Sequence, residues 1–491
     1  MKKKVVVIGA GFAGLSAAAF MAREGWAVTL VDRHPTAGGR ARQHLARGFT
    51  FDMGPSWYWM PEVFERFFAQ FGRNVADQYS LTRLDPSYRV YWNEGHDDIP
   101  APIEGRIELF ESIEPGSGQR LMKYLQEAGT KYRIGMQELV YRPGLSVREF
   151  MDPAVLMQFL KLDVISSIRK HVARHFKSPK LRQLMEFPIL FLGALPQNTP
   201  ALYSLMNHAD IAGGTWFPQG GMYAIVQAMQ RLCEDLGVQF RFKEDVKQIA
   251  IENGRASRVI TDAGEHEADV VISGADYHFT ESKLLSGSYR SYTEDYWDSR
   301  KLAPSCLLYY VGLEKKIDDL QHHSLFFDVP FEQHADQIHL NPEWPREPLF
   351  HLCAPSRTDP HVAPEGCENL VFLIPVAAGL YGDTQELQDR YFEVILQRLE
   401  ERSGQRIRER IVYRKSYSGS DLQADHNAYK GNAYGLANTL WQTAILRPSC
   451  KSRKVANLYY TGQFTVPGPG VPPSLISGEV VSNQVILDQE R

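Results

Sequence analysis

The sequence contains little cysteine. Its 491 residues include only five cysteines, scattered along the chain without a C-x-x-C pair: Cys233, Cys306, Cys353, Cys367 and Cys450. This pattern argues against a disulfide framework and against a structural zinc site. Scattered thiols fit a reduced, cytoplasmic setting, and we expect no metal site.

Strong charge of one sign and long apolar runs are also absent. The 54 Lys and Arg residues and the 58 Asp and Glu residues leave a net charge of −4, which indicates neither a nucleic-acid binder nor an enzyme for acidic substrates. Beyond the N-terminal region, the longest apolar run, Val371 to Tyr381, contains Pro375 and Gly379 and is too short to span a bilayer. We therefore predict no transmembrane helix. The length predicts two or three globular domains.

What the chain does contain is a glycine motif near its start. Val5 to Ile8 is an apolar run typical of a parallel strand buried on both faces, and three glycines follow it in the pattern G-x-G-x-x-G. The glycines permit a tight turn, a close approach of backbone to a pyrophosphate, and close packing of helix on strand. The diphosphate would lie on free N–H groups at the helix start. The candidate residues for cofactor binding here are Gly9, Gly11, Phe12, Ala13 and Gly14.

Two further features favour FAD as the cofactor. Asp32 stands at the end of a second predicted strand, where a carboxylate can accept hydrogen bonds from ribose hydroxyls; the alternative is a surface acid that closes the strand. Gly38-Gly39-Arg40 adds a second glycine loop, which a long flavin dinucleotide needs and NAD does not. We therefore favour FAD over NAD and extend the candidate site to Asp32, Arg33, Gly39 and Arg40.

A Gly-Pro turn follows at Gly54-Pro55-Ser56, and we expect its backbone to lie against the flavin. Trp57, Tyr58 and Trp59 come next. They could line an apolar tunnel or be ordinary core residues, and the pattern does not separate these alternatives.

Later stretches return to the dinucleotide-binding sheet. Val246, which opens a predicted strand, is a further candidate for cofactor binding, and Ala268 to Asp276 predicts another strand of the sheet. A proline-rich loop near the C-terminus then leads into a helix, whose N-terminus could support negative charge on a reduced flavin. The alternative is a purely structural proline turn. The candidates from this loop are Gly462, Gly470, Val471 and Pro472.

These stretches predict an α/β fold in which a Rossmann-like FAD-binding domain is interleaved with an α+β substrate domain that carries a helical, membrane-contacting region. We assign residues 1–80, 216–290 and 431–491 to the FAD-binding domain. Residues 81–215 and 291–430 are assigned to the substrate domain.

The stretch from Pro153 to Leu184 combines a broad apolar face with many Lys and Arg residues. Such a face suits an interfacial helix on an anionic bilayer; the alternative is a buried helix with a solvated basic face. His171 and His175 lie there at i, i+4 spacing, but no acidic partner accompanies them, so we expect no metal at this position either. We expect a cytoplasmic protein, peripheral at the inner face of the cell membrane.

Several segments match one family. They are Val7-Ile-Gly-Ala-Gly-Phe-Ala-Gly-Leu-Ser16, Gly38-Gly-Arg-Ala41, Phe51-Asp-Met-Gly-Pro-Ser56, Phe217-Pro-Gln-Gly-Gly221, His351 to Pro355, and Thr358 to Cys367. On these motifs the chain resembles, essentially from end to end, the bacterial phytoene desaturase family of carotenoid flavoenzymes. The last segment is the most discriminating, because general flavin amine oxidases lack it.

One departure concerns the C-terminal motif. The family usually carries His-Pro-Gly after small residues, whereas this chain has Gln463-Phe-Thr-Val466 before Pro467-Gly468. The glycine–proline frame persists, so the departure bears on the desaturation pattern rather than on flavin binding.

The resemblance implies FAD-dependent desaturation of a long, uncharged isoprenoid taken from the membrane. A hydride would pass from an allylic C–H to flavin N5, and a proton would leave the neighbouring carbon. Because the allylic cation is delocalised, an apolar tunnel, accurate placement and one acid/base suffice. The Arg–acid pair of the family corresponds here to Arg148 and Glu149, with Glu149 as the candidate acid/base; an exposed ion pair at a helix start is the alternative.

The leading hypothesis is therefore a phytoene desaturase. The alternatives are a carotenoid isomerase, which would use reduced flavin without net oxidation, a desaturase of a later carotenoid intermediate, and a soluble flavin amine oxidase. The expected partners are a phytoene-like carotenoid and the membrane surface, without nucleic acid, and a homo-oligomer is compatible with the sequence.

Overall fold

The computed structural model describes residues 2–146, 149, 162–163 and 166–490. A parallel sheet of five strands, in the order β19-β13-β1-β2-β9, forms the first part of the fold. Its strands are β1 (Lys4–Ile8), β2 (Ala27–Asp32), β9 (Gln239–Phe242), β13 (Val270–Ser273) and β19 (Leu458–Tyr460). All neighbouring strands in this sheet are parallel, which confirms the predicted Rossmann-like arrangement.

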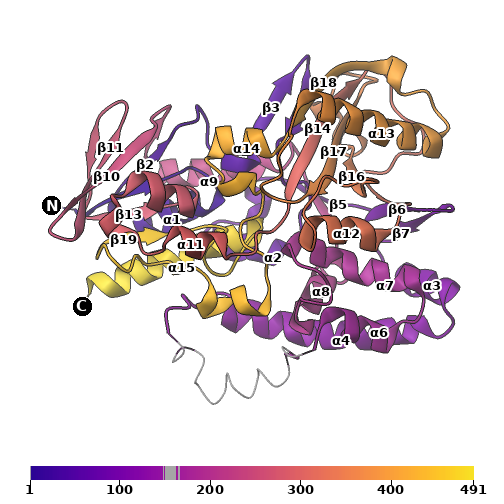
Figure 1. Ribbon diagram of the computed structural model, residues 1–491, viewed down its shortest axis with the longest axis horizontal. Helices are drawn as coiled ribbons and strands as arrows, with labels where there is room; N and C mark the ends of the chain where they lie inside the picture. Colours follow the sequence, from indigo (N-terminus) through magenta and orange to yellow (C-terminus); the bar gives the residue numbers. More distant parts are fainter. Residues whose placement is uncertain (1, 147–148, 150–161, 164–165, 491) are drawn as a thin grey trace.

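Helices cover one face of this sheet and a small antiparallel sheet covers the other, so β1 is buried on both faces. Helices α1 and α15 pack so closely that a Cβ atom on Gly478 would lie 2.5 Å from the Cβ of Ser16. The two chain ends consequently lie near each other (Figure 1). The elements are α1 (Phe12–Arg23), α9 (Tyr223–Asp235), α15 (Val471–Gln489), β10 (Val246–Glu252), β11 (Arg255–Thr261) and β12 (Glu265–Glu267).

A second, mixed sheet of seven strands has the order β18-β14-β17-β16-β15-β6-β7. Only the β15–β6 pair among them is parallel. Helix α13 (Gln385–Ser403) packs on one face, and α12 (Phe331–His339) lies between the sheet and the helical region (Figure 1). The strands are β6 (Tyr88–Trp92), β7 (His96–Ile99), β14 (Ser305–Leu313), β15 (His323–Phe327), β16 (Phe350–Cys353), β17 (Glu368–Val376) and β18 (Ile411–Tyr417).

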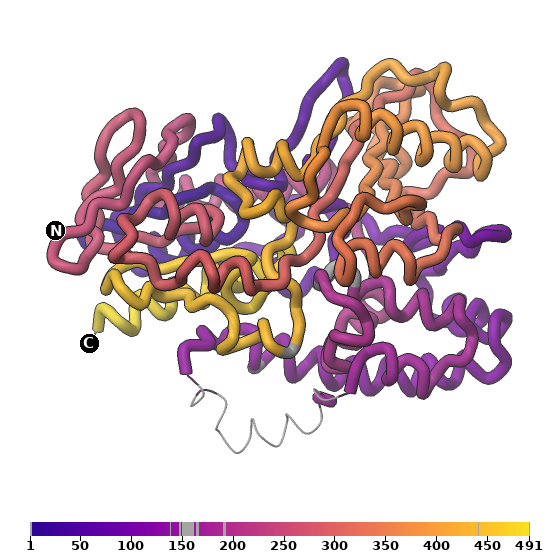
Figure 2. Tube along the Cα trace, in the orientation of Figure 1, coloured from indigo at the N-terminus to yellow at the C-terminus, as the bar shows by residue number. Residues whose placement is uncertain are grey.

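Short elements connect the two sheets, and Figure 2 shows the chain passing repeatedly between them. Two small antiparallel pairs join β3 with β4 and β5 with β8. The predicted interleaving agrees with this path, while the domain boundaries at residues 80, 215, 290 and 430 stay predictions. These elements are α2 (Pro61–Ala69), α10 (Tyr277–Phe279), α11 (Glu294–Asp298), α14 (Gly419–His426), β3 (Gln43–Ala46), β4 (Phe49–Asp52), β5 (Leu81–Arg83) and β8 (Trp216–Pro218).

A helical region packs beside the second sheet (Figure 1). It comprises α3 (Ile103–Ile113), α4 (Ser117–Ile134), α6 (Ile168–His175), α7 (Pro179–Glu186) and α8 (Leu205–Ile211). No helix in the described ranges is both long and apolar enough to cross a membrane.

The stretch expected to be an interfacial helix differs from that expectation in its described part. It contains two short helices, α6 and α7, because Pro179 starts a new helix rather than continuing the old one. Leu162 and Ile168, the members of its apolar face that the structure describes, are fully buried in the protein. Other members of that face, Val155, Leu156, Phe159, Leu160 and Ile165, lie outside the described residues, and the membrane contact of this stretch stays a prediction.

Candidate active site

The first glycine loop joins β1 to α1, and its geometry requires glycine. Gly9 has a φ of +95°, a conformation that L side chains rarely adopt. A Cβ atom on Gly14 would lie 1.9 Å from the carbonyl oxygen of Gly9. A Cβ on Gly11 would meet only the Cα of Gly39, at 3.9 Å, so the middle of the loop is open to a neighbour.

The second glycine loop lies directly against the first. The N–H of Gly38 donates to the carbonyl of Ala10 at 2.8 Å. Gly38 and Gly39 both have positive φ, and a Cβ on Gly39 would lie 3.2 Å from the Cα of Gly11. The fold thus joins two backbone loops, which the sequence separates, into one narrow cradle without side chains. Phe12 and Ala13 form the first turn of α1 beside it.

Asp32 lies at the carboxyl end of β2, next to the cradle. One carboxylate oxygen accepts the N–H of Ala10 at 2.6 Å and the other accepts the N–H of His34 at 2.8 Å. Each oxygen keeps a lone pair, so the carboxylate can also accept from ribose hydroxyls. Arg33 is exposed and lies 3.9 Å from Asp245.

Arg40 supplies an independent test of whether an anionic cofactor fits here. Its Nε atom is buried and has no hydrogen-bond partner among the described residues. Burial lowers the pKa of Arg40, and the buried carboxylate of Asp276 partly offsets this effect. A buried guanidinium with an unused donor beside two glycine loops fits the diphosphate or flavin end of FAD.

The other predicted loops reach the same place. A Cβ atom on Gly54, in the Gly54-Pro55-Ser56 turn, would lie 2.6 Å from the carbonyl oxygen of Arg40. A Cβ atom on Gly462 would lie 3.7 Å from the Cβ of Ala13. Gly470 precedes α15, with Val471 and Pro472 in its first turn. The structure therefore places Gly54 against the loop of Arg40 and Gly462 against the start of α1, while Gly470 precedes α15.

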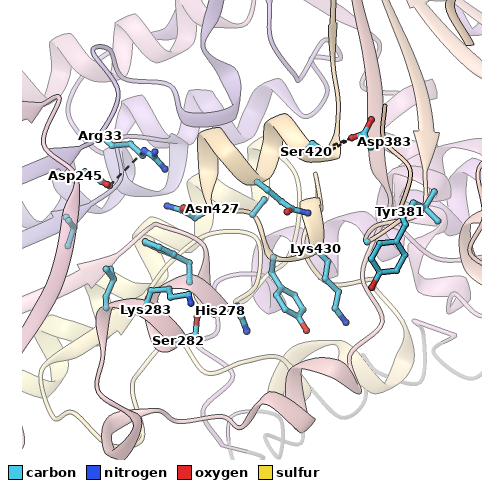
Figure 3. A pocket seen from close by; sticks show the side chains of 18 of the residues that line it. Arg33, Asp245, His278, Ser282, Lys283, Tyr381, Asp383, Ser420, Asn427 and Lys430 are labelled. Carbon is cyan, nitrogen blue, oxygen red and sulfur yellow. Dashed lines mark hydrogen bonds and ion pairs between the residues drawn. The ribbon is translucent and has the colours of Figure 1, made fainter. Parts of the chain in front are cut away.

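Val246 and Arg33 line a common pocket of about 920 Å³ (Figure 3). Its wall also includes polar residues from distant segments, among them His278, Asn427 and Lys430. Arg33 directly follows Asp32 in the chain, so this pocket lies next to the carboxylate predicted to bind ribose. Its position and volume suit the adenosine half of a dinucleotide.

A second, apolar pocket lies between α12 and the seven-stranded sheet. It has almost no polar lining apart from two histidines, Ser305 and Tyr434. We call it the apolar pocket; its residues are Phe187, Pro304, Ser305, Leu325, Phe327, Phe331, His334, Ala335, Ile338, Leu349, Phe350, His351, Leu373, Pro375 and Tyr434. Such a lining suits a hydrocarbon, and the pocket, with a volume of about 70 Å³, holds only a short segment of one.

Buried histidines connect the apolar pocket to the Gly54 turn. Trp57, which follows that turn, stacks on His323 with ring centroids 4.1 Å apart. Nδ1 of His323 lies 3.1 Å from Nε2 of His351, which lines the apolar pocket. Burial lowers the pKa of His351 to about 3 and that of His323 well below its usual range, so both rings are neutral.

The three aromatic residues after the turn divide between the two predicted alternatives. Tyr58 and Trp59 are buried core residues: the Tyr58 hydroxyl bonds that of Tyr79, and Trp59 Nε1 donates to Thr215. Trp57 instead lies against the histidines beside the apolar pocket.

The predicted catalytic pair is described only in part. Arg148 lies outside the described residues. The Glu149 carboxylate accepts N–H groups from Gly144, Leu145 and Ser146 at 2.8–2.9 Å. Three backbone donors on one carboxylate favour a role in holding this turn, and the catalytic role of Glu149 stays a prediction.

Sequence reasoning missed the lining of the apolar pocket and the His323–His351 pair. His351 was noticed only as the start of a family segment. The apolar run Leu325-Phe-Phe327, followed by Phe331, could have indicated an apolar site. The sequence does not show that Leu325 lies opposite His351, because that contact depends on the pairing of β15 with β16.

Comparisons with known proteins agree with this site. Residues 12–486 match the family described as flavin containing amine oxidoreductase. A carotenoid 3,4-desaturase of Haloarcula japonica is 41% identical over 99% of this chain and 98% of that protein. A zeta-carotene-forming phytoene desaturase of Myxococcus xanthus is 32% identical over 99% of this chain and 94% of that protein.

Solved structures share the fold at lower identity. An oxidoreductase from Methanosarcina mazei has a TM-score of 0.64 at 19% identity, covering 98% of this chain and 100% of that chain. A putrescine oxidase has a TM-score of 0.62 at 14% identity, covering 99% of each chain. With identity to two desaturases over nearly its whole length, the chain belongs to the carotenoid desaturase family of FAD-dependent oxidoreductases.

Proposed function

We propose that this protein introduces a conjugated double bond into a long, acyclic carotenoid. The observation that carries the proposal is the apolar pocket, joined through Trp57 and two neutral histidines to the turn that approaches the glycine cradle. FAD, when bound, supplies a two-electron acceptor for the hydride at its N5 atom. We infer that the predicted glycine loops, Asp32, Arg33, Arg40 and Val246 hold it.

The residues of the apolar pocket bind and orient a short segment of the hydrocarbon. Phe327 and Phe331 are buried and line the pocket with Leu325 and Leu349, so contact with these side chains keeps an apolar chain out of water and lowers its free energy there. Among the described residues that line the apolar pocket there is no Lys, Arg, Asp or Glu. Exclusion of water protects a delocalised cation from capture by solvent.

The proton leaves toward a neutral imidazole. His351 lines the pocket, and its contact with His323 fixes its ring. An allylic cation is a far stronger acid than an imidazolium ion, so even a histidine whose pKa is lowered to about 3 can accept the proton. Glu149 is the competing acid/base.

Two variants separate these candidates. We expect His351→Gln to lower turnover about 100-fold with FAD retained, and Glu149→Gln to leave turnover unchanged. The reverse result would assign the acid/base role to Glu149.

The substrate reaches the site from a membrane surface. Four exposed apolar side chains gather where the turn at Gly144 meets the loop at Ala444: a Cβ atom on Gly144 would lie 3.4 Å from the carbonyl group of Ala444. We call them the membrane patch: Leu145, Trp441, Ile445 and Leu446, with Trp441 76% exposed. An exposed Trp among aliphatic residues is typical of a surface that lies in a bilayer interface. The protein would thus be peripheral at the inner face of the cell membrane.

A partly conjugated carotenoid is a better candidate substrate than phytoene. The chain is 41% identical to a carotenoid 3,4-desaturase and 32% identical to a phytoene-desaturating relative. Phytoene, which the sequence motifs favour, stays the alternative, as does isomerisation.

The decisive experiment mixes FAD-loaded enzyme anaerobically with carotenoids in liposomes. We expect an already conjugated carotenoid to bleach the flavin and to shift its own polyene absorption bands to longer wavelength. We expect no such change with phytoene. Bleaching with phytoene would reverse the choice of substrate. A change in isomer without net oxidation would indicate an isomerase, and no response to any carotenoid would overturn the proposal.

A further inference from the structure

Three metal-ligating side chains converge in the helical region, away from the candidate active site. Glu127 comes from α4, and His171 and His175 lie one turn apart on α6. The ligand atoms of the three residues lie within 4.8 Å of one another. Glu127 Oε2 is 3.8 Å from Nε2 of His171 and 3.6 Å from Nε2 of His175. The acidic partner that the local sequence did not offer is therefore supplied by another helix.

The Nε2 atom of His171 is available to bind a metal ion. Its side chain is 4% exposed, and Nε2 has no hydrogen-bond partner among the described residues. Its other nitrogen, Nδ1, lies 3.9 Å from a carboxylate oxygen of Asp163. A carboxylate therefore lies near each ring nitrogen, and a metal bound at Nε2 would leave the proton on Nδ1, the side that faces Asp163.

We propose that Glu127, His171 and His175 bind a divalent metal ion of the zinc class. A tetrahedral zinc ion with bonds of about 2.1 Å separates its ligand atoms by about 3.4 Å, close to the two distances to Glu127. Two imidazoles and one carboxylate leave a fourth position for water, and Glu127, with 39% of its side chain exposed, gives the ion access from solvent.

The metal would link α4 to α6 and so stabilise the helical region.

Positively charged neighbours lower the affinity of the site for a cation without occupying it. Lys131 Nζ donates to the carbonyl of Ala201 and to Ser204, and Arg174 lies 3.5 Å from Asp163. The affinity expected is therefore that of a three-ligand site in a basic region, weaker than a four-cysteine zinc site.

Co²⁺ is the best probe, because its four-coordinate form absorbs at longer wavelength than flavin. We expect FAD-loaded, chelator-treated enzyme to bind one Co²⁺ with such a band, and Zn²⁺ to displace it. Glu127→Gln and His175→Ala should each abolish the band. Asp163→Asn, which removes only the carboxylate behind His171, should raise the Kd about 10–100-fold. His96→Ala, which removes an exposed histidine of β7, is the matched control and should leave the spectrum unchanged.

Retained flavin absorbance and carotenoid turnover show that each variant is folded. The half-exposed Glu127→Gln keeps the size of the side chain and serves if the buried histidine variants are unstable. Absence of the Co²⁺ band in the wild-type enzyme would overturn the proposal. An equal Kd in wild type, Glu127→Gln and His175→Ala would do so as well, by placing the metal elsewhere.

Discussion

The glycine cradle and the apolar pocket are built in opposite ways. The cradle is made of backbone: the close contacts at Gly14, Gly39 and Gly54 leave no room for side chains. The apolar pocket is made of side chains, most of them from the successive elements β15, α12, β16 and β17, with Phe187 and Tyr434 added from distant parts of the chain. A site made of backbone tolerates almost no substitution, whereas a site made of side chains can change shape while the fold persists. This difference explains how one fold can hold the same cofactor and accept different substrates.

We expect the largest effect, loss of FAD, from a side chain added to the first glycine loop. Gly14→Ala places a Cβ atom 1.9 Å from the carbonyl oxygen of Gly9, so β1 and α1 must separate. We expect nearly complete loss of bound FAD, measured as flavin absorbance that stays with the protein on gel filtration. Gly287→Ala, where a Cβ meets nothing within 4 Å, is the matched control and should keep its FAD. Full flavin content in Gly14→Ala would refute the backbone role of this loop.

The half-buried carboxylate of Asp52, at the end of β4 and two residues before Gly54, should make stability depend on pH. Burial raises the pKa of Asp52 to about 7, against 3.8 for an unperturbed group, although the N–H groups of Met222 and Tyr223 bond it. As the pH rises from about 4 to 7, the unfolded chain ionises Asp52 before the folded protein does. The contribution of Asp52 to stability therefore falls over this window, by up to about 4 kcal/mol, and is constant above it.

Asp52→Asn removes this titration. Its stability relative to the wild type should rise between pH 4 and pH 7, measured by the urea midpoint of each protein at several pH values. A constant difference between the two proteins across that range would contradict the raised pKa.

A larger side chain in the apolar pocket should lower turnover without changing the amount of bound FAD. Ala335 lies on α12, is 4% exposed and lines the pocket. We expect Ala335→Phe to lower kcat/KM for a carotenoid about 100-fold by filling the space, with unchanged flavin content. Ala335→Val should have an intermediate effect. Loss of flavin together with turnover would show that the two sites are not separable.

The smallest effect is expected at the membrane patch. Trp441→Ser removes one exposed aromatic side chain and should weaken binding to anionic liposomes about 5-fold, measured by co-sedimentation. Tyr381→Ser is a suitable control, because Tyr381 is 95% exposed but lines the pocket of Arg33 and Val246 instead. Equal loss in both variants would argue against a local membrane surface.

The two glycine loops and their FAD cofactor could be predicted from local sequence alone. The loop Gly9–Gly14, the Gly38-Gly39-Arg40 loop and Asp32 act through local backbone geometry, so their spacing along the chain carries the information. The parallel sheet follows from the same stretches and from the apolar runs that return to it.

The residues that line the apolar pocket, and the partners of the buried histidines, follow from tertiary packing and not from local sequence. His351 meets His323 through the pairing of β15 with β16, and Glu127 reaches His171 because α4 packs beside α6. Apolar stripes look the same in sequence whether they face a core, a pocket or a membrane, since burial depends on what packs against them. That is why Leu162 and Ile168, which suited a membrane helix, lie inside the protein, while Trp441 is exposed.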